Sequence, residues 1–187
     1  AAPDYDDDHS PEHAAAVSLV VGHARPRPDD VVLDLGTGTG AVALDLAPDA
    51  GTVLGRDISE GMLAEARKKA GERGVDVDFA EGRFRQPNAD AADVVTSNFA
   101  MHHLGDDEKR EAIDTIADLG PRRIVLGDVM LFGDDDPDAP FYSPEVDDPA
   151  TVGVLADAFT DAGYALTGVE MVTEQAGVLV AEQVDSD

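Results

Sequence analysis

The sequence predicts an α/β fold, a three-layer sandwich whose seven-stranded sheet is mostly parallel and ends in an antiparallel C-terminal hairpin. Two observations predict this fold. Short apolar segments alternate with amphipathic helical segments, which is typical of parallel strands joined by helical crossovers. Only residues 173–176 separate the last two apolar segments, and so short a connection can join only antiparallel strands. The length of 187 residues suits a single domain over residues 1–187.

The first element is expected to be an N-terminal helix over residues 10–25. Ser10 can cap this helix, Pro11 suits its first turn, and Pro26 ends it. The preceding residues 1–9 are polar and acidic, and we expect them to be flexible.

Strands and helices then alternate along the chain. The crossover strands are expected at Val31–Leu35, Thr52–Asp57, Asp76–Glu81, Ala92–Asn98 and Arg122–Met130, and the hairpin strands at Tyr164–Val172 and Gly177–Val184. The remaining helices are expected at Thr39–Leu46, Glu60–Gly74, Asp107–Leu119 and Pro149–Ala162. Residues 132–148 form a long loop, and loops of that length in compact domains are usually functional or mobile.

The charge balance is extreme. Forty acidic residues against 13 basic ones leave a net charge of −27. Such charges repel one another in dilute buffer, whereas molar salt reduces the Debye length to roughly 3 Å and screens them. The acid-rich, lysine-poor composition resembles that of cytoplasmic proteins from salt-in halophilic archaea. This resemblance implies a cytoplasmic protein adapted to high salt.

The sequence also argues against nucleic-acid partners, membrane spans, disulfides and metal sites. No basic stripe is available for phosphates, so a nucleic-acid partner is not expected. No apolar run approaches 18 residues, so no membrane span is expected. Cysteine is absent, which excludes disulfides and thiolate metal sites. The pattern His9-Ser10-Pro11-Glu12-His13 spells a zinc-protease motif, but the predicted helix starts inside it, so no metal site is expected.

The strongest motif is the segment DLGTGTG, residues 34–40, which follows a buried strand and precedes a helix. Glycines let a backbone pass close to a ligand and adopt positive φ, and the helix N-terminus offers free N–H groups. Gly36, Gly38 and Ala41 also satisfy the dinucleotide fingerprint, with Asp57 where a ribose-binding acid belongs. The glycine loop alone therefore leaves two cofactor classes open.

Two residues separate these classes. Asp34 precedes the first glycine by two positions, and the third glycine is Gly40, which gives the pattern D-x-G-x-G-x-G. This pattern resembles motif I of the class I S-adenosylmethionine-dependent methyltransferases, a family with a Rossmann-like fold. The resemblance implies S-adenosylmethionine as the cofactor. It also implies that the binding loop contributes Asp34, Gly36, Thr37, Gly38 and Gly40.

The segment after the second strand extends the resemblance. Asp57 holds the position of the family's ribose-binding acid, and a carboxylate has enough lone pairs to accept from both ribose hydroxyls. Ile58 and Met62 are expected to pack near the adenine. Ser59 is expected to act as a helix N-cap.

The third segment departs from the family pattern. After Gly82 the family usually has Asp or Asn facing the adenine amino group, whereas this chain has Arg83. A guanidinium only donates hydrogen bonds, so Arg83 would stack on the adenine or turn outward. In the second case the backbone N–H of Phe84 would recognise the base.

The fourth segment ends in Asn98-Phe99-Ala100-Met101-His102-His103-Leu104 and resembles motif IV of small-molecule and quinone-type methyltransferases. The backbone at Asn98 would contact the methionine end of the cofactor. His102 and His103 are the candidate catalytic bases, since imidazole titrates near pH ~6.5. The alternative is that they only stabilise the turn.

The predicted function is therefore methyl transfer from S-adenosylmethionine to a small molecule, by a monomer or homodimer. The helix at residues 10–25 and the loop at residues 132–148 would cover the substrate. One alternative is an NAD(P)-dependent oxidoreductase, although Tyr5, Tyr142 and Tyr164 all lack a lysine four residues on. A second alternative is a non-catalytic S-adenosylmethionine-binding regulatory module.

Overall fold

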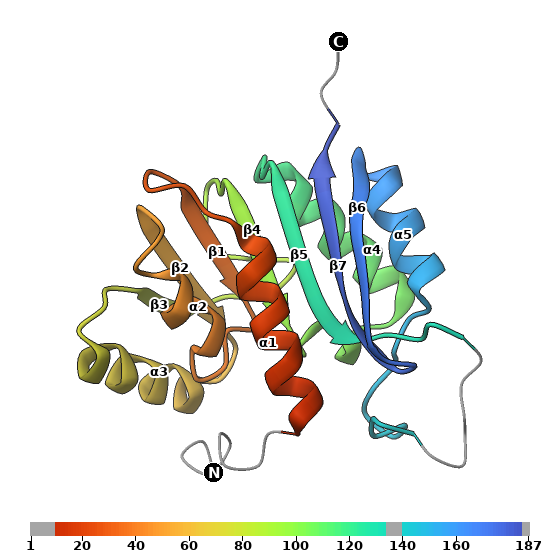
Figure 1. Cartoon of the computed structure of the whole chain (residues 1–187), viewed down its shortest axis with the longest axis horizontal. Helices are drawn as coiled ribbons and strands as arrows, with labels where there is room; N and C mark the ends of the chain where they lie inside the picture. The colour runs from red at the N-terminus through yellow and green to blue at the C-terminus, as the bar shows by residue number, and fades with distance from the viewer. Residues whose placement is uncertain (1–9, 134–139, 185–187) are drawn as a thin grey trace.

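A computed structural model describes residues 10–133 and 140–184 of the chain. A seven-stranded sheet has the order β3-β2-β1-β4-β5-β7-β6 (Figure 1). The strands are β1 (Val31–Leu35), β2 (Thr52–Asp57), β3 (Asp78–Glu81), β4 (Val94–Asn98), β5 (Arg123–Val129), β6 (Tyr164–Thr173) and β7 (Ala176–Gln183). Strands β1 to β5 pair in parallel, whereas β7 runs antiparallel to β5 and β6. The predicted sheet and its C-terminal hairpin are confirmed.

Helices cover both faces of the sheet (Figure 1). They are α1 (Pro11–Ala24), α2 (Ala41–Leu46), α3 (Glu60–Arg73), α4 (Asp106–Asp118) and α5 (Val152–Asp161), together with η3 (Met101–His103), a 3₁₀ turn. Helices α1, α2 and α3 pack on one face, and α4 and α5 pack on the other. None of the helices within the described ranges is long and apolar enough to cross a membrane.

The two faces of the sheet belong to two separate apolar cores, because side chains alternate along each strand. In β1, Val32 packs into the core beneath α1 to α3, whereas Leu33 and Leu35 pack into the core beneath α4 and α5. Strands buried on both faces read as continuous apolar runs, which is how the crossover strands were recognised in the sequence.

Several element boundaries differ from the prediction, for local reasons. Helix α2 begins at Ala41 instead of Thr39, because Gly40 adopts a left-handed φ of 88° as its N-cap. Helix α5 begins at Val152 instead of Pro149, because the Thr151 side chain accepts a hydrogen bond from the N–H of Val154 at 3.2 Å and caps the helix there. Strands β3 and β4 each begin two residues later than expected.

The fold places the predicted motifs at one edge of the sheet. Strands β1, β2 and β4 are parallel neighbours, so the residues that follow their carboxyl ends meet there. The predicted loop at 132–148 is described only at 132–133 and 140–148, and the predicted flexible segment at 1–9 lies outside the described residues.

Candidate active site

A pocket of about 690 Å³ lies at this carboxyl edge. Its size falls within the range of roughly 300–1,000 Å³ that is typical of small-molecule and cofactor sites. Most of the predicted site residues line it: Asp34, Gly36, Thr37, Gly38, Asp57, Ile58, Met62, Arg83, Phe84, Asn98 and His103. Gly40 and His102 are the predicted site residues that are not part of the wall.

The glycines of the loop serve different purposes. A Cβ atom on Gly36 would collide with Ala100, whereas one on Gly38 would meet no atom within 4 Å. Gly38 therefore leaves the backbone open toward the pocket. Gly40 lies behind the loop, where a Cβ atom would press against Phe79 at 3.1 Å. Its position serves the packing of α2 on the sheet and not the pocket wall.

Asp57 connects the end of β2 to the glycine loop. Its Oδ2 accepts a hydrogen bond from the N–H of Gly38 at 2.8 Å, and its Oδ1 accepts one from the N–H of Ser59 at 2.9 Å. An ionised carboxylate has about four lone-pair sites, so about two remain for a ligand. The carboxylate is thus oriented toward the pocket with accepting capacity in reserve.

Asp34 is almost completely buried beneath the loop. Its two oxygens accept hydrogen bonds from the hydroxyls of Thr37 at 2.6 Å and Thr96 at 2.7 Å, which ties the loop to β4. Burial raises the pKa of Asp34 to about 6, although both hydroxyls oppose that rise. With both oxygens engaged, Asp34 acts first as a support for the glycine loop.

Apolar side chains from the start of α3 form the next part of the wall. Ile58 is 68% exposed, which is unusual for an isoleucine, and it lines the pocket together with Met62. Ser59 caps α3 as predicted, since its hydroxyl accepts a hydrogen bond from the N–H of Met62 at 3.4 Å. An exposed apolar surface at the rim suits a flat, apolar ligand group.

Arg83 and Phe84 belong to a tight turn at the pocket rim. The turn is closed by reciprocal backbone hydrogen bonds between Arg83 and Gln86 at 2.9 and 3.0 Å. Arg83 is exposed, while Phe84 is partly buried and packs against the core beneath α4 and α5. The turn therefore holds both predicted residues at the pocket rim, and it does not distinguish between their two predicted modes of base recognition.

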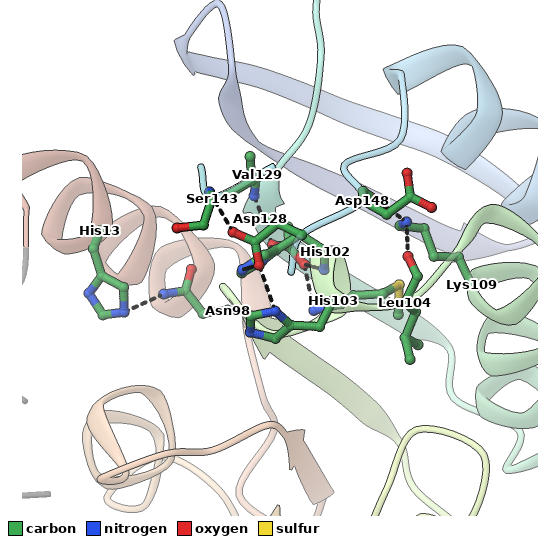
Figure 2. A network of polar contacts seen from close by, with 12 residues as sticks. His13, Asn98, His102, His103, Leu104, Lys109, Asp128, Val129, Ser143 and Asp148 are labelled. Carbon is green, nitrogen blue, oxygen red and sulfur yellow. Dashed lines mark hydrogen bonds and ion pairs between the residues drawn. The ribbon is translucent and has the colours of Figure 1, made fainter. Parts of the chain in front are cut away.

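The segment after β4 carries the opposite wall. The Asn98 amide lies 3.4 Å from Nε2 of His13, which projects from α1 (Figure 2). Phe99 adopts a positive φ of 52°, a strained conformation for a residue other than glycine, and such strain is concentrated at functional sites. Its ring meets the His13 ring edge to face, with centroids 5.2 Å apart. His13 also lines the pocket, although the sequence indicated it only within a rejected zinc-protease motif and not as a site residue.

The two candidate catalytic histidines occupy different environments. The His103 side chain is 58% exposed and faces the pocket, and its Nδ1 lies 2.8 Å from Oδ1 of Asp147. His102 is buried, and its Nδ1 lies 2.5 Å from Oδ1 of Asp128 (Figure 2). Burial alone would lower the pKa of His102, but the hydrogen bond and charge of Asp128 outweigh it and raise the pKa overall.

Two acidic partners of this histidine pair were missed at the sequence level. Asp128 is the single acidic residue of β5 and follows an apolar run close to the carboxyl end of that strand, and that signal could have identified it. Asp147 is one of several acids in an acidic loop, so its sequence carried no comparable signal.

Comparison with known proteins agrees with this geometry. Residues 32–119 match a family described as a methyltransferase domain. An uncharacterized methyltransferase from Geobacillus sp. is 38% identical over 104 residues, which are 56% of this chain and 46% of that protein. Demethylmenaquinone methyltransferase from Thermus thermophilus is 43% identical over 99 residues, or 50% of this chain and 43% of that protein. The chain spans about half the length of these curated relatives.

A solved structure extends the likeness to almost the whole chain. Magnesium protoporphyrin IX methyltransferase from Synechocystis PCC 6803, solved with bound S-adenosylmethionine, superposes with a TM-score of 0.72 at 23% identity. The match covers 92% of this chain and 78% of that one. The fold is thus the Rossmann-like fold of class I methyltransferases. S-adenosylmethionine, the predicted cofactor, is the cofactor of this class.

Proposed function

We propose that this chain is an S-adenosylmethionine-dependent methyltransferase that acts on a small organic molecule. One observation carries the proposal: a single pocket joins the glycine loop and Asp57 at one end to His13 and His103 at the other. The first end suits the cofactor, and the second leaves room for a methyl acceptor.

The residues of the first end fit the cofactor. Asp57 has lone pairs left for both ribose hydroxyls, because its two present hydrogen bonds use only half of its accepting capacity. Gly38 leaves the loop backbone uncovered on the pocket side. Ile58 and Met62 offer an apolar surface for the adenine ring.

Methyl transfer requires no covalent intermediate on the protein. When bound, S-adenosylmethionine would supply an electrophilic methyl group: the acceptor atom bonds to the methyl carbon as the carbon–sulfur bond breaks, S-adenosylhomocysteine leaves, and a base takes any proton that the acceptor loses. The protein then has to hold the two reactants close together and aligned, an effect worth roughly 7–11 kcal/mol. Val17, Phe99 and Leu104 give the acceptor end apolar walls that restrict water. Only His103 of the two candidate bases lines the pocket, so contact with the acceptor falls to it and His102 supports it from behind.

Two considerations favour a small acceptor over a macromolecule. The net charge of −27 opposes the approach of nucleic acid. Two of the similar proteins, the demethylmenaquinone and magnesium protoporphyrin IX methyltransferases, are named for small organic molecules. The apolar walls of the acceptor end are consistent with an acceptor of that kind.

Calorimetric titration in molar KCl tests the proposal. S-adenosylmethionine, S-adenosylhomocysteine and NAD are titrated separately into the native chain, the Asp57→Ala variant and the Asp114→Ala variant. Asp114 is exposed on α4 and is not part of the pocket wall, so its variant matches the loss of charge without touching the site. We expect micromolar binding of the first two ligands, weakened by about 1.5–3 kcal/mol or more in Asp57→Ala only, since the loop amides also lose their acceptor.

Each other outcome identifies an alternative. Binding of NAD alone would replace the proposal with an oxidoreductase. Binding of S-adenosylmethionine without methyl transfer to any member of a quinone, phenol and porphyrin panel would favour the regulatory module. Equal losses in the two variants would show that Asp57 does not contact the cofactor.

A further inference from the structure

Three potential metal ligands converge beside the candidate active site. The Oδ1 atom of Asp147 lies 2.8 Å from Nδ1 of His103 and 3.7 Å from Nε2 of His102. All three donor atoms lie within 4.8 Å of one another. Two ligands at tetrahedral positions about 2.1 Å from one ion are separated by roughly 3.4 Å, so the two distances to Asp147 require only small shifts to receive an ion.

The Asp147 carboxylate is positioned by the loop that carries it. Its Oδ2 accepts a hydrogen bond from the N–H of Ser143 at 2.8 Å, which turns Oδ1 toward the histidines. The next residue, Asp148, donates its N–H to the His102 carbonyl at 2.8 Å and receives a hydrogen bond on its own carbonyl from Lys109 Nζ. The side chain of Asp147 is only 8% exposed. Its Oδ1 accepts no well-formed hydrogen bond from the described residues.

His102 is oriented from its other side. Its Nδ1 lies 2.5 Å from Oδ1 of Asp128 (Figure 2). Its Nε2 lies 3.7 Å from Oδ1 of Asp147. Asp128 is itself fixed by the backbone N–H groups of Met101 at 2.7 Å and Val129 at 2.8 Å. Metal-binding histidines almost always donate the N–H of their second ring nitrogen to a carboxylate, a backbone carbonyl or water, which fixes the tautomer and the ring orientation.

We propose that His102, His103 and Asp147 bind a divalent first-row transition ion such as Zn²⁺ or Co²⁺. Two imidazoles and one carboxylate suit these ions, whereas Mg²⁺ and Ca²⁺ prefer oxygen ligands throughout. Three protein ligands leave at least one coordination position open. His103 belongs both to this cluster and to the pocket wall, so the cluster adjoins the pocket. The site does not depend on the proposed methyltransferase activity.

Metal binding to the full chain tests this proposal without any activity assay. The protein is stripped with a chelator and then titrated with Zn²⁺ in molar KCl, which suppresses weak binding to its many surface carboxylates. Co²⁺ is titrated in parallel, because its visible absorption reports ligand geometry. We expect one equivalent to bind to the native chain. We expect at least a ~10-fold to 100-fold loss of affinity in His103→Ala and in Asp147→Asn.

The control is His23→Ala. His23 on α1 is partly buried and pairs with Glu170, but no second histidine lies in that pair, so its removal should leave the stoichiometry and affinity unchanged. His103 is exposed, so the His103→Ala variant should fold normally, and thermal unfolding checks this. Equal binding by the native chain and the cluster variants would overturn the proposal. So would Mg²⁺ binding as tight as Zn²⁺.

Discussion

At the scale of single residues, the site depends on groups whose charge is controlled by burial. Asp34 accepts two hydroxyl hydrogen bonds under the glycine loop, yet burial raises its pKa to about 6. Asp57, closer to the ligand, has both oxygens on backbone amides. The two aspartates beside the glycine loop therefore have different roles: Asp34 supports the loop, and Asp57 is available to a ligand.

The raised pKa of Asp34 should make the stability of the fold depend on pH. Its pKa rises from 3.8 to about 6 on folding, so between these values the unfolded chain has lost a proton that the folded chain retains. Stability from this group is complete below pH 3.8 and falls as pH rises to about 6, by on the order of 3 kcal/mol. Asp34→Asn cannot titrate, so its stability relative to the native chain should improve by that amount from pH 4 to pH 7.

Urea unfolding at a series of pH values measures this difference. Because the chain has many other carboxylates, the informative quantity is the variant's free energy of unfolding minus that of the native chain at each pH. Asp114→Asn, an exposed substitution, should give a flat difference. A flat difference for Asp34→Asn as well would mean that Asp34 titrates normally in the folded chain.

At the scale of elements, the sequence identified strands and helices more reliably than it identified side-chain partners. Repeated apolar segments identified the strands of the sheet, because strands buried on both faces are apolar along most of their length. The glycine loop was predictable, since its three glycines and Asp34 lie close together in sequence. The partners of the histidine pair were not, because Asp128 and Asp147 reach it from β5 and from a distant loop. Gly40 is the opposite case. The motif predicted it as a pocket residue, but in the structure it lies where α2 packs on the sheet.

Lys109 joins α4 to the loop that carries Asp147 and Asp148. Its side chain is 2% exposed, and its ammonium donates to the carbonyls of Leu104 and Asp148. Lys109→Met keeps the length but leaves both carbonyls unpaired, so we expect a loss of about 1–3 kcal/mol in the free energy of unfolding. Urea denaturation in molar KCl measures this. Lys68→Met, at an exposed position on α3, should change stability by less than about 0.5 kcal/mol. Similar losses of stability in Lys109→Met and Lys68→Met would contradict this role of Lys109.

At the scale of the whole molecule, charge is the dominant feature. The net charge of −27 is distributed over the chain, and the few basic residues pair with acids on several elements. Isolated surface pairs of this kind contribute little, about 0–1 kcal/mol each. They cannot offset the general repulsion. We therefore propose that the chain is adapted to high salt, in keeping with the composition.

Salt should stabilise this fold strongly. Raising KCl from about 0.1 M to molar concentration shortens the Debye length from roughly 10 Å to roughly 3 Å and removes most repulsion between surface carboxylates. Each kcal/mol gained raises the melting temperature by about 2–4 °C in a chain of this size, so a rise on the order of 10 °C is expected. Thermal unfolding followed by circular dichroism measures it. At pH 4.5, where many carboxylates are protonated, the rise should shrink; an equal rise at both pH values would exclude charge screening as its cause.

The burial of Lys109 has a practical consequence for chemical labelling. The sequence has only three lysines, and the other two, Lys68 and Lys69, lie together on α3. Amine-directed reagents should therefore modify α3 in the folded chain and reach Lys109 only when α4 and the loop at Asp148 separate. The rate at which Lys109 is modified, measured by mass spectrometry, therefore reports the rate of that local opening. A bound metal ion or acceptor that holds Asp147 in place should slow it.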